Sequence, residues 1–173
     1  MILKDLMDIT MLYTGMNLGQ EALIYYNELI DYLLLKYPEK ITAPISETVE
    51  VKSDRRFQLP RIWASVLKVK SRDGRRVYCE IIDDVLVFPY SGTFEIRYTK
   101  KPSVTKSMDD KLEHNRIFDI CIPYYFAWKM SEREQLSANK IQKYQMQFLD
   151  YLNIAVTNRA KQRLKYIKSQ PMI

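Results

Sequence analysis

Glycine, cysteine and histidine are scarce in this 173-residue sequence, which has four, two and one of them, respectively. With so few glycines, the chain has no phosphate-cradling loop of the P-loop or dinucleotide-binding type. One histidine and two separated cysteines make no recognised metal-ligand spacing. A nucleophilic triad would lack its base. We therefore predict a protein that is not an enzyme and that uses neither a cofactor nor a metal.

Two further absences bear on location. No apolar run approaches the ~20 residues that a membrane span requires, and the first ten residues lack the basic start and small-residue cleavage site of a signal peptide. Cys79 and Cys121 lie among apolar neighbours. This favours buried free thiols over a disulfide, and a reducing compartment.

The remaining polar groups that could carry chemistry have simpler interpretations. We expect His114, which stands between Glu113 and Asn115, to be exposed or to cap a helix entry. The adjacent pairs Asp83–Asp84 and Asp109–Asp110 are expected in turns, where neighbouring carboxylates point apart into solvent. None of these groups predicts catalysis.

A long stretch with helical periodicity, residues 117–168, dominates the C-terminal part. It contains no glycine and one proline, Pro123. That proline predicts either a kink or a helix start displaced to about Ile122, because it removes one backbone donor. A terminal helix is predicted to begin near Ser137. Its apolar residues recur at three- and four-residue steps: Ile141, Tyr144, Phe148, Leu152 and Ala155.

Within the first hundred residues, the predicted secondary structure changes once, from helices to strands. Two helices are predicted at about 1–16 and 20–37, the second ending before Pro38. Ile2, Leu6, Ile9 and Tyr13 are expected on one side of the first helix. From about residue 45, short alternating runs predict strands at 48–51, 56–59, 64–70, 76–82, 85–89 and 93–98, with Asp73–Gly74 as a hairpin turn.

This order predicts an α+β fold. A helical bundle is formed by both ends of the chain, with an inserted antiparallel β meander or small barrel and a long C-terminal helix. The expected division is residues 1–44 for the N-terminal helical pair, 45–102 for the β lobe, and 103–173 for the C-terminal helices and a projecting basic tail. Burying each apolar side chain between the two helical parts stabilises the fold by ~1.5–3 kcal/mol.

The net charge of +6 is concentrated in the C-terminal part, where residues 100–173 hold 14 basic and 7 acidic side chains. Five basic and no acidic residues occur within 159–168, interleaved with apolar ones. This segment can be a solvated helix end that complements the helix dipole, or it can dock on a partner. The predicted partner-binding residues are Arg159, Lys161, Arg163, Leu164, Lys165, Tyr166, Ile167 and Lys168.

Tyrosine is abundant, with 13 residues in the chain. Tyrosines can lie at the edge of a small core with their hydroxyl groups in water, or they can line a subunit interface. On the second interpretation, the candidate interface residues are Tyr144, Phe148, Tyr151 and Leu152.

Several motifs occur in an order that resembles the head-to-tail connector proteins of tailed bacteriophages, also called adaptors or neck-ring proteins. The resemblance begins with the N-terminal helical pair and spans nearly the whole chain. A strand exit carries Ile96, Tyr98 and Pro102, and an acidic loop follows at Asp109–Asp110. The helical motifs are Pro123, Tyr124, Tyr125 and Ala127, then Lys143, Tyr144 and Phe148.

The resemblance implies a virion structural protein without catalytic activity. It would occupy the neck, at the head–tail interface, after assembly in the host cytoplasm. Its partners would be the portal protein, a downstream tail or neck protein, and copies of itself in a ring, usually twelve. The helical bundle would build the ring, and the C-terminal helix or tail would dock on the portal. DNA would pass through the channel without sequence recognition.

Two other functions compete with this expectation. A small basic DNA-binding protein would bind duplex DNA with an affinity that falls steeply as salt increases. It would also need a basic stripe outside the last helical turns. A stopper or tail-completion protein is a nearer alternative, but such proteins are mostly β and have less C-terminal helix.

Overall fold

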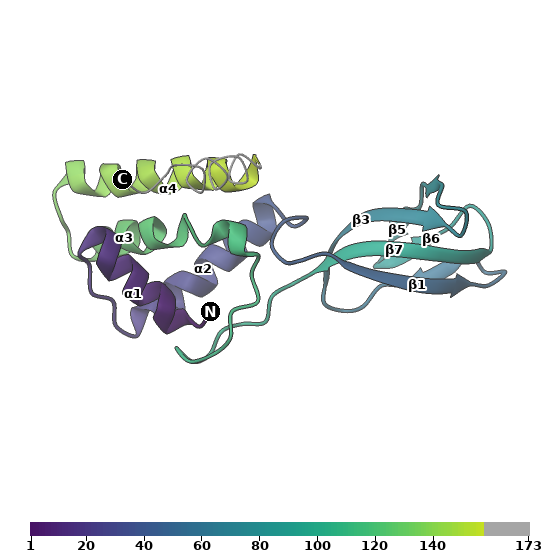
Figure 1. Ribbon diagram of the computed structural model, residues 1–173, viewed down its shortest axis with the longest axis horizontal. Coiled ribbons are helices and arrows are strands. Elements are labelled where there is room, and N and C mark those ends of the chain that lie inside the picture. Colours follow the sequence, from purple (N-terminus) through teal and green to yellow (C-terminus); the bar gives the residue numbers. More distant parts are fainter. Residues whose placement is uncertain (158–173) are drawn as a thin grey trace, which may run out of the picture. The chain divides into compact units, whose positions relative to one another are not determined.

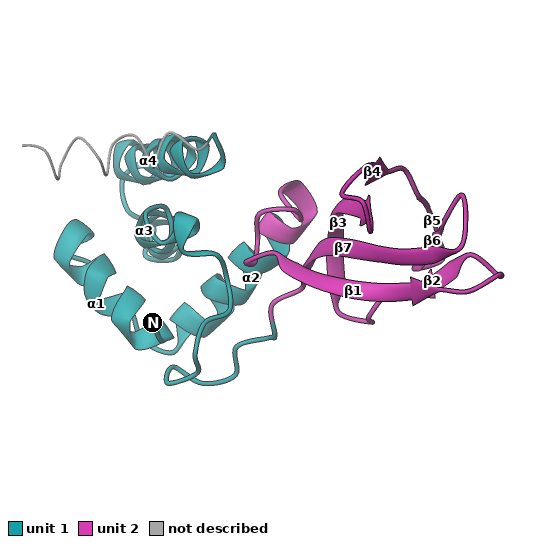
Figure 2. Cartoon of the chain, turned by 45° about the vertical axis from the view of Figure 1, so that its right-hand side comes forward, with its two compact units in different colours: residues 1–32, 103–173 teal, residues 33–102 magenta. Residues whose placement is uncertain are grey.

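The computed structural model describes residues 1–157. The chain forms two compact units (Figure 2): a helical unit of residues 1–32 together with the chain from residue 103 onward, and a β unit of residues 33–102. The first boundary between the two units lies between residues 32 and 33, within a helix. The predicted α+β class is confirmed, with helices before and after an antiparallel β section.

The helical unit is built from both ends of the described chain (Figure 1). Helix α3 packs against both α1 and α4. The helices are α1 (Leu3–Thr14), α2 (Glu21–Lys36), the short 3-10 helix η1 (Arg116–Phe118), α3 (Ile122–Arg133) and α4 (Ala138–Val156). None of the described helices combines the length and hydropathy that a membrane span requires.

Pro123 sets the start of α3. The helix begins at Ile122, so the proline lies in the first turn, where a missing backbone N–H leaves no intrahelical bond unmade. Of the two predicted outcomes, the displaced start is therefore correct. Helix α4 begins immediately after Ser137, as predicted.

The end of α1 differs from the expectation. Its buried residues are Leu3, Leu6 and Thr10. The helix ends at Thr14 and is capped by Gly15, whose φ of 73° lies in the left-handed region that glycine tolerates. The Gly15 N–H donates to the Met11 carbonyl over 2.9 Å. Tyr13, expected on the buried side, is instead 61% exposed.

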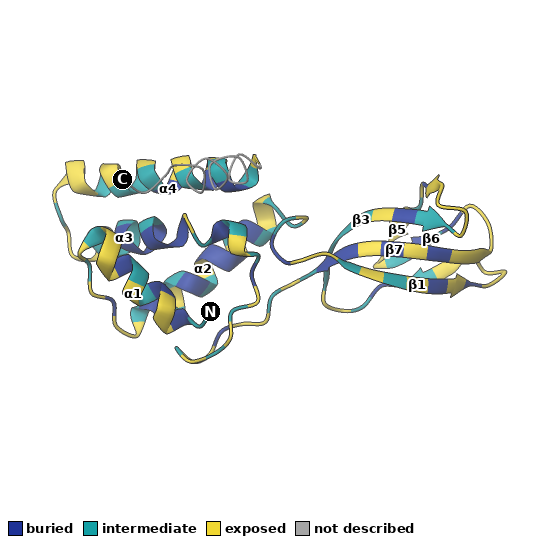
Figure 3. Cartoon of the chain, viewed as in Figure 1, coloured by how far each residue is buried: buried dark blue, intermediate teal, exposed yellow. Residues whose placement is uncertain are grey.

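The β unit contains two antiparallel sheets, with strand orders β1-β7-β3-β4 and β2-β6-β5. The strands are β1 (Ile45–Val51), β2 (Arg56–Gln58), β3 (Trp63–Ser71), β4 (Arg76–Val77), β5 (Glu80–Ile82), β6 (Val85–Val87) and β7 (Gly92–Lys100). The burial alternates along β7 (Figure 3), so that one face packs inward and the other faces solvent. The inner side chains of both sheets join one core, which includes Val49, Val69, Leu86, Phe88, Phe94 and Ile96.

The strand order is not that of a simple meander. Strand β1 pairs with β7 from Ile45 opposite Tyr98 to Val51 opposite Gly92, and β2 pairs with β6. The single strand predicted over 76–82 is split into β4 and β5, which belong to different sheets. The chain changes sheets between Val77 and Glu80, as strands do at the corners of packed β structures.

Candidate interaction surfaces

The predicted partner-binding residues, 159–168, lie outside the described residues, and their role stays a prediction. The predicted subunit-interface residues occupy two different environments. Phe148 is only 2% exposed and Leu152 is also buried, so both belong to the core of the helical unit. Tyr144 and Tyr151 are half-buried and reach the surface. Among these four side chains, therefore, only the tyrosines could contact another subunit without a rearrangement.

Tyrosines from three helices meet near the C-terminal end of α1. The rings of Tyr124 and Tyr151 stack with their centroids 4.7 Å apart and their planes 3° from parallel. Burial, the hydrogen bond with Tyr151 and the nearby phenols of Tyr151 and Tyr13 raise the pKa of Tyr124 to about 12. The Tyr144 hydroxyl donates to the Thr14 carbonyl over 3.3 Å. We call Tyr13, Tyr124, Tyr144 and Tyr151 the tyrosine surface.

Large apolar side chains are also exposed at the C-terminal end of α1. Met11, Leu12 and Tyr13 are consecutive at the end of α1, and Leu12 is 79% exposed. Exposed apolar groups that adjoin tyrosines are typical of protein interfaces. Helical periodicity does not predict this exposed end of α1, because the expected inner face of the first helix includes Tyr13.

His114 is buried, and the expectation of an exposed or capping histidine is wrong. The Tyr26 hydroxyl lies 2.7 Å from its Nδ1, and the Asp119 carboxylate lies 2.7 Å from its Nε2. Burial and the charges of Asp119 and Glu113 raise the pKa of Tyr26. These bonds connect α2 to the segment that leads into α3. Because the His114 side chain is only 2% exposed and both ring nitrogens are occupied, a substrate cannot reach it.

The acidic pairs occupy turns, as predicted. Asp83 and Asp84 have φ angles of 50° and 63° in the turn between β5 and β6, which suits a tight hairpin. Asp110 accepts from the backbone N–H groups of Lys106 and Ser107 over 2.8 and 2.9 Å, and these bonds lower its pKa. Among residues 1–157, no three histidine, cysteine, aspartate or glutamate side chains come together as a metal site.

The comparisons with known proteins do not assign the chain to a protein class. No protein-family model matches the chain, and no curated protein has a significant match to its sequence. The functional proposal therefore depends on the order of the helical and β segments along the chain, on the tyrosine surface and on the sequence motifs.

Proposed function

We propose that the protein is a non-enzymatic head-to-tail adaptor of a tailed bacteriophage, which forms a ring below the portal and links it to the tail. The observation that carries the proposal is the helical unit built from both chain ends with an antiparallel β unit inserted between them. This is the arrangement that the resemblance implies, and the motifs occur in the same order along the chain.

A ring requires two different contact faces on each subunit, because its head-to-tail contacts close by rotation. The tyrosine surface supplies one of them. Three of its four rings are already held in place, those of Tyr124 and Tyr151 by stacking and that of Tyr144 by its bond to Thr14, so these rings lose little side-chain freedom on contact. Leu12, which precedes Tyr13 at the end of α1, adds exposed apolar area.

The basic segment 159–168 supplies the contact with the portal in this proposal. Its five positive charges suit an acidic surface, and Leu164, Tyr166 and Ile167 supply apolar anchors of the kind that fill a groove. A segment of this composition combines electrostatic attraction with apolar burial. The downstream tail or neck protein would contact the β unit.

The proposal is tested by mixing the purified protein with assembled portal. We expect a largely monomeric protein alone and a ring complex with portal, observed by sedimentation and by electron microscopy of the mixture. The copy number is read from the same images. A protein that stays unbound in the presence of assembled portal would contradict the proposal, whatever else it binds.

Deleting residues 159–173 is expected to abolish docking on the portal and to leave the unfolding midpoint largely unchanged. A matched variant separates charge from apolar contact. It keeps the full length and replaces Arg159, Lys161, Arg163, Lys165 and Lys168 by glutamine. Normal docking by the truncated protein would refute the role of this segment.

Tyr13→Asp is expected to weaken ring assembly on the portal at least tenfold, because it places a charge within an apolar contact. The side chain is 61% exposed, but the new carboxylate stands in the last turn of α1 at the negative end of the helix dipole, so the free energy of unfolding should fall by up to about 1 kcal/mol. Ile24→Asp, at an exposed position on α2, is the control. If the two variants assemble equally well, the tyrosine surface is not a ring contact.

A further inference from the structure

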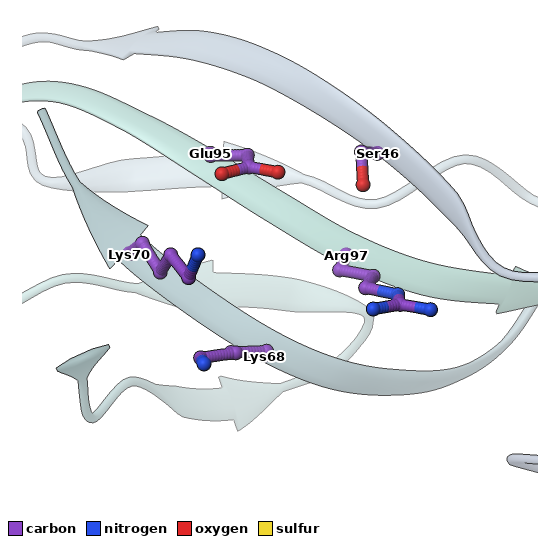
Figure 4. A pocket seen from close by; sticks show the side chains of 5 residues that line it. All are labelled: Ser46, Lys68, Lys70, Glu95 and Arg97. Carbon is purple, nitrogen blue, oxygen red and sulfur yellow. The ribbon is translucent and has the colours of Figure 1, made fainter. Parts of the chain in front are cut away.

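The outward face of the four-stranded sheet carries a group of basic side chains. Lys68 and Lys70 extend from β3 and Arg97 from the neighbouring β7 (Figure 4). Together with Ser46 and Glu95 they line a shallow hollow of about 90 Å³. Arg76 on β4 lies opposite Lys70 and continues the row, with its guanidinium 5.2 Å from the centre of the Tyr78 ring. We call Lys68, Lys70, Arg76 and Arg97 the basic sheet face.

The strand register places like charges directly opposite each other. Lys68 pairs with Arg97 between β3 and β7, and Lys70 pairs with Arg76 between β3 and β4. Like charges at opposed positions of a sheet destabilise it. Among residues 1–157, no carboxylate lies within ion-pair distance of any of these four cations, although Glu95 is opposite Lys70.

Packing does not require these charges. The inner face of the same strands supplies the core through Val69, Phe94 and Ile96, whereas Lys68, Glu95 and Arg97 are exposed. These like-charge pairs therefore cost stability without adding to the core, and Glu95, opposite Lys70, forms no ion pair with it. Sequences break such local rules mainly where function requires it. Four cations beside the single carboxylate of Glu95 leave an excess of positive charge, which points to an anionic ligand.

We propose that the basic sheet face binds the phosphate backbone of a double-stranded nucleic acid, without reading its sequence. The outward positions of the edge strand β1 are polar, with Ser46 opposite Arg97, Thr48 opposite Glu95 and Glu50 opposite Thr93. A protein partner would favour an apolar or aromatic centre, whereas nucleic-acid interfaces are polar and strongly positive. Single strands are held by stacking on several aromatic rings, but the hollow has no aromatic lining.

Each group has a defined role in this contact. Lysine and arginine neutralise phosphates and position the duplex, and the Ser46 hydroxyl can donate to a phosphate oxygen. Glu95 opposes binding, because its carboxylate lies among the cations and repels the phosphates. Removal of Glu95 should therefore strengthen binding, an effect that damage to the fold would not produce.

This inference uses only contacts within the β unit and does not rest on the proposed function. Portal docking and duplex binding are measured separately, so either can fail alone. A protein that docks on portal but does not bind duplex overturns the inference and leaves the adaptor proposal intact. The reverse result overturns the adaptor proposal alone.

The test uses the full-length protein and a short labelled DNA duplex of arbitrary sequence, with binding followed by fluorescence anisotropy between about 50 and 200 mM salt. The test variant is Lys68→Gln with Arg97→Gln. The matched control is Lys52→Gln with Arg61→Gln, which removes the same charge from exposed positions in the same unit. Both variants keep the basic segment 159–168. The third variant is Glu95→Gln, and polyglutamate serves as an alternative ligand.

Loss of two phosphate contacts should lower the slope of log affinity against log salt by about 2 in the test variant. The control should retain the slope of the natural chain, and Glu95→Gln should bind the duplex several-fold more tightly. Equal slopes in the test variant and the control would overturn the proposal, as would unchanged affinity in Glu95→Gln. It would also be overturned if the test variant lost polyglutamate binding and kept duplex binding, since the face would then fit an acidic protein.

Discussion

Phe148→Ala is expected to lower the free energy of unfolding of the helical unit by about 3–5 kcal/mol, which is typical of truncating a buried aromatic side chain. Phe148 is 2% exposed. Its ring centroid lies 5.1 Å from that of Tyr125, 5.9 Å from that of Trp128 and 6.3 Å from that of Tyr32. The substitution leaves a cavity among these three rings, and close packing around the buried Tyr125 limits how far they can move to fill it.

The two tryptophans allow the units to be followed separately. Trp128 lies in α3 and stacks on Phe148, whereas Trp63 lies in β3 of the other unit. A Trp63→Phe background therefore leaves one tryptophan, Trp128, whose selectively excited fluorescence reports on the helical unit during denaturant unfolding. Leu149→Ala is the matched control. It changes the next residue of the same helix, where the side chain is 48% exposed, and should cost less than about 1 kcal/mol. Equal losses in the two variants would contradict the core position of Phe148.

Helical periodicity predicted which residues of α4 are buried, because the spacing of apolar residues along one helix face can be read from the local sequence. The spacing of Phe148, Leu152 and Ala155 indicated a buried stripe, and all three are buried. The same reasoning failed at Tyr13. The contacts of α1 with α3 select Leu3, Leu6 and Thr10, and that stripe continues toward Thr14, which is half-buried. Only the packed neighbour decides which of two adjacent positions turns inward.

Strand pairing depends on residues that are far apart in the sequence. Alternation predicted most strands, but it cannot state that β1 pairs with β7 or that β4 and β5 join different sheets. The basic sheet face illustrates the consequence. Lys68 and Arg97 are unremarkable in the sequence and become a like-charge pair only when the register between β3 and β7 is known.

The environment of His114 could not be predicted for the same reason. Its neighbours Glu113 and Asn115 are polar and indicated exposure. Its burial results from a contact with Tyr26, which lies 88 residues earlier in the chain, and from the return of Asp119 after one turn of 3-10 helix. A hydrogen-bonded site of this kind becomes visible only when distant segments are placed side by side.

His114→Ala is therefore expected to destabilise the helical unit by about 3 kcal/mol. It removes a partner from the Tyr26 hydroxyl and from the Asp119 carboxylate, and each unsatisfied buried group costs roughly 1–3 kcal/mol. Asp119 contributes the smaller share, because its side chain is 20% exposed and can be hydrated. Asn115→Ala is the control. It removes only an amide oxygen that accepts from the Ile117 N–H over 3.2 Å, and should cost about 1 kcal/mol.

Tyr26→Phe removes only the hydrogen bond between the Tyr26 hydroxyl and His114. It keeps the ring, which lies 5.6 Å from the His114 ring, and deletes the hydroxyl, so we expect a loss of about 1–2 kcal/mol. Because both substitutions remove the same hydrogen bond, the double variant should lose less stability than the sum of the single variants. Denaturant unfolding of all four proteins gives this coupling. Strict additivity would mean that the 2.7 Å contact between Tyr26 and His114 contributes nothing to stability.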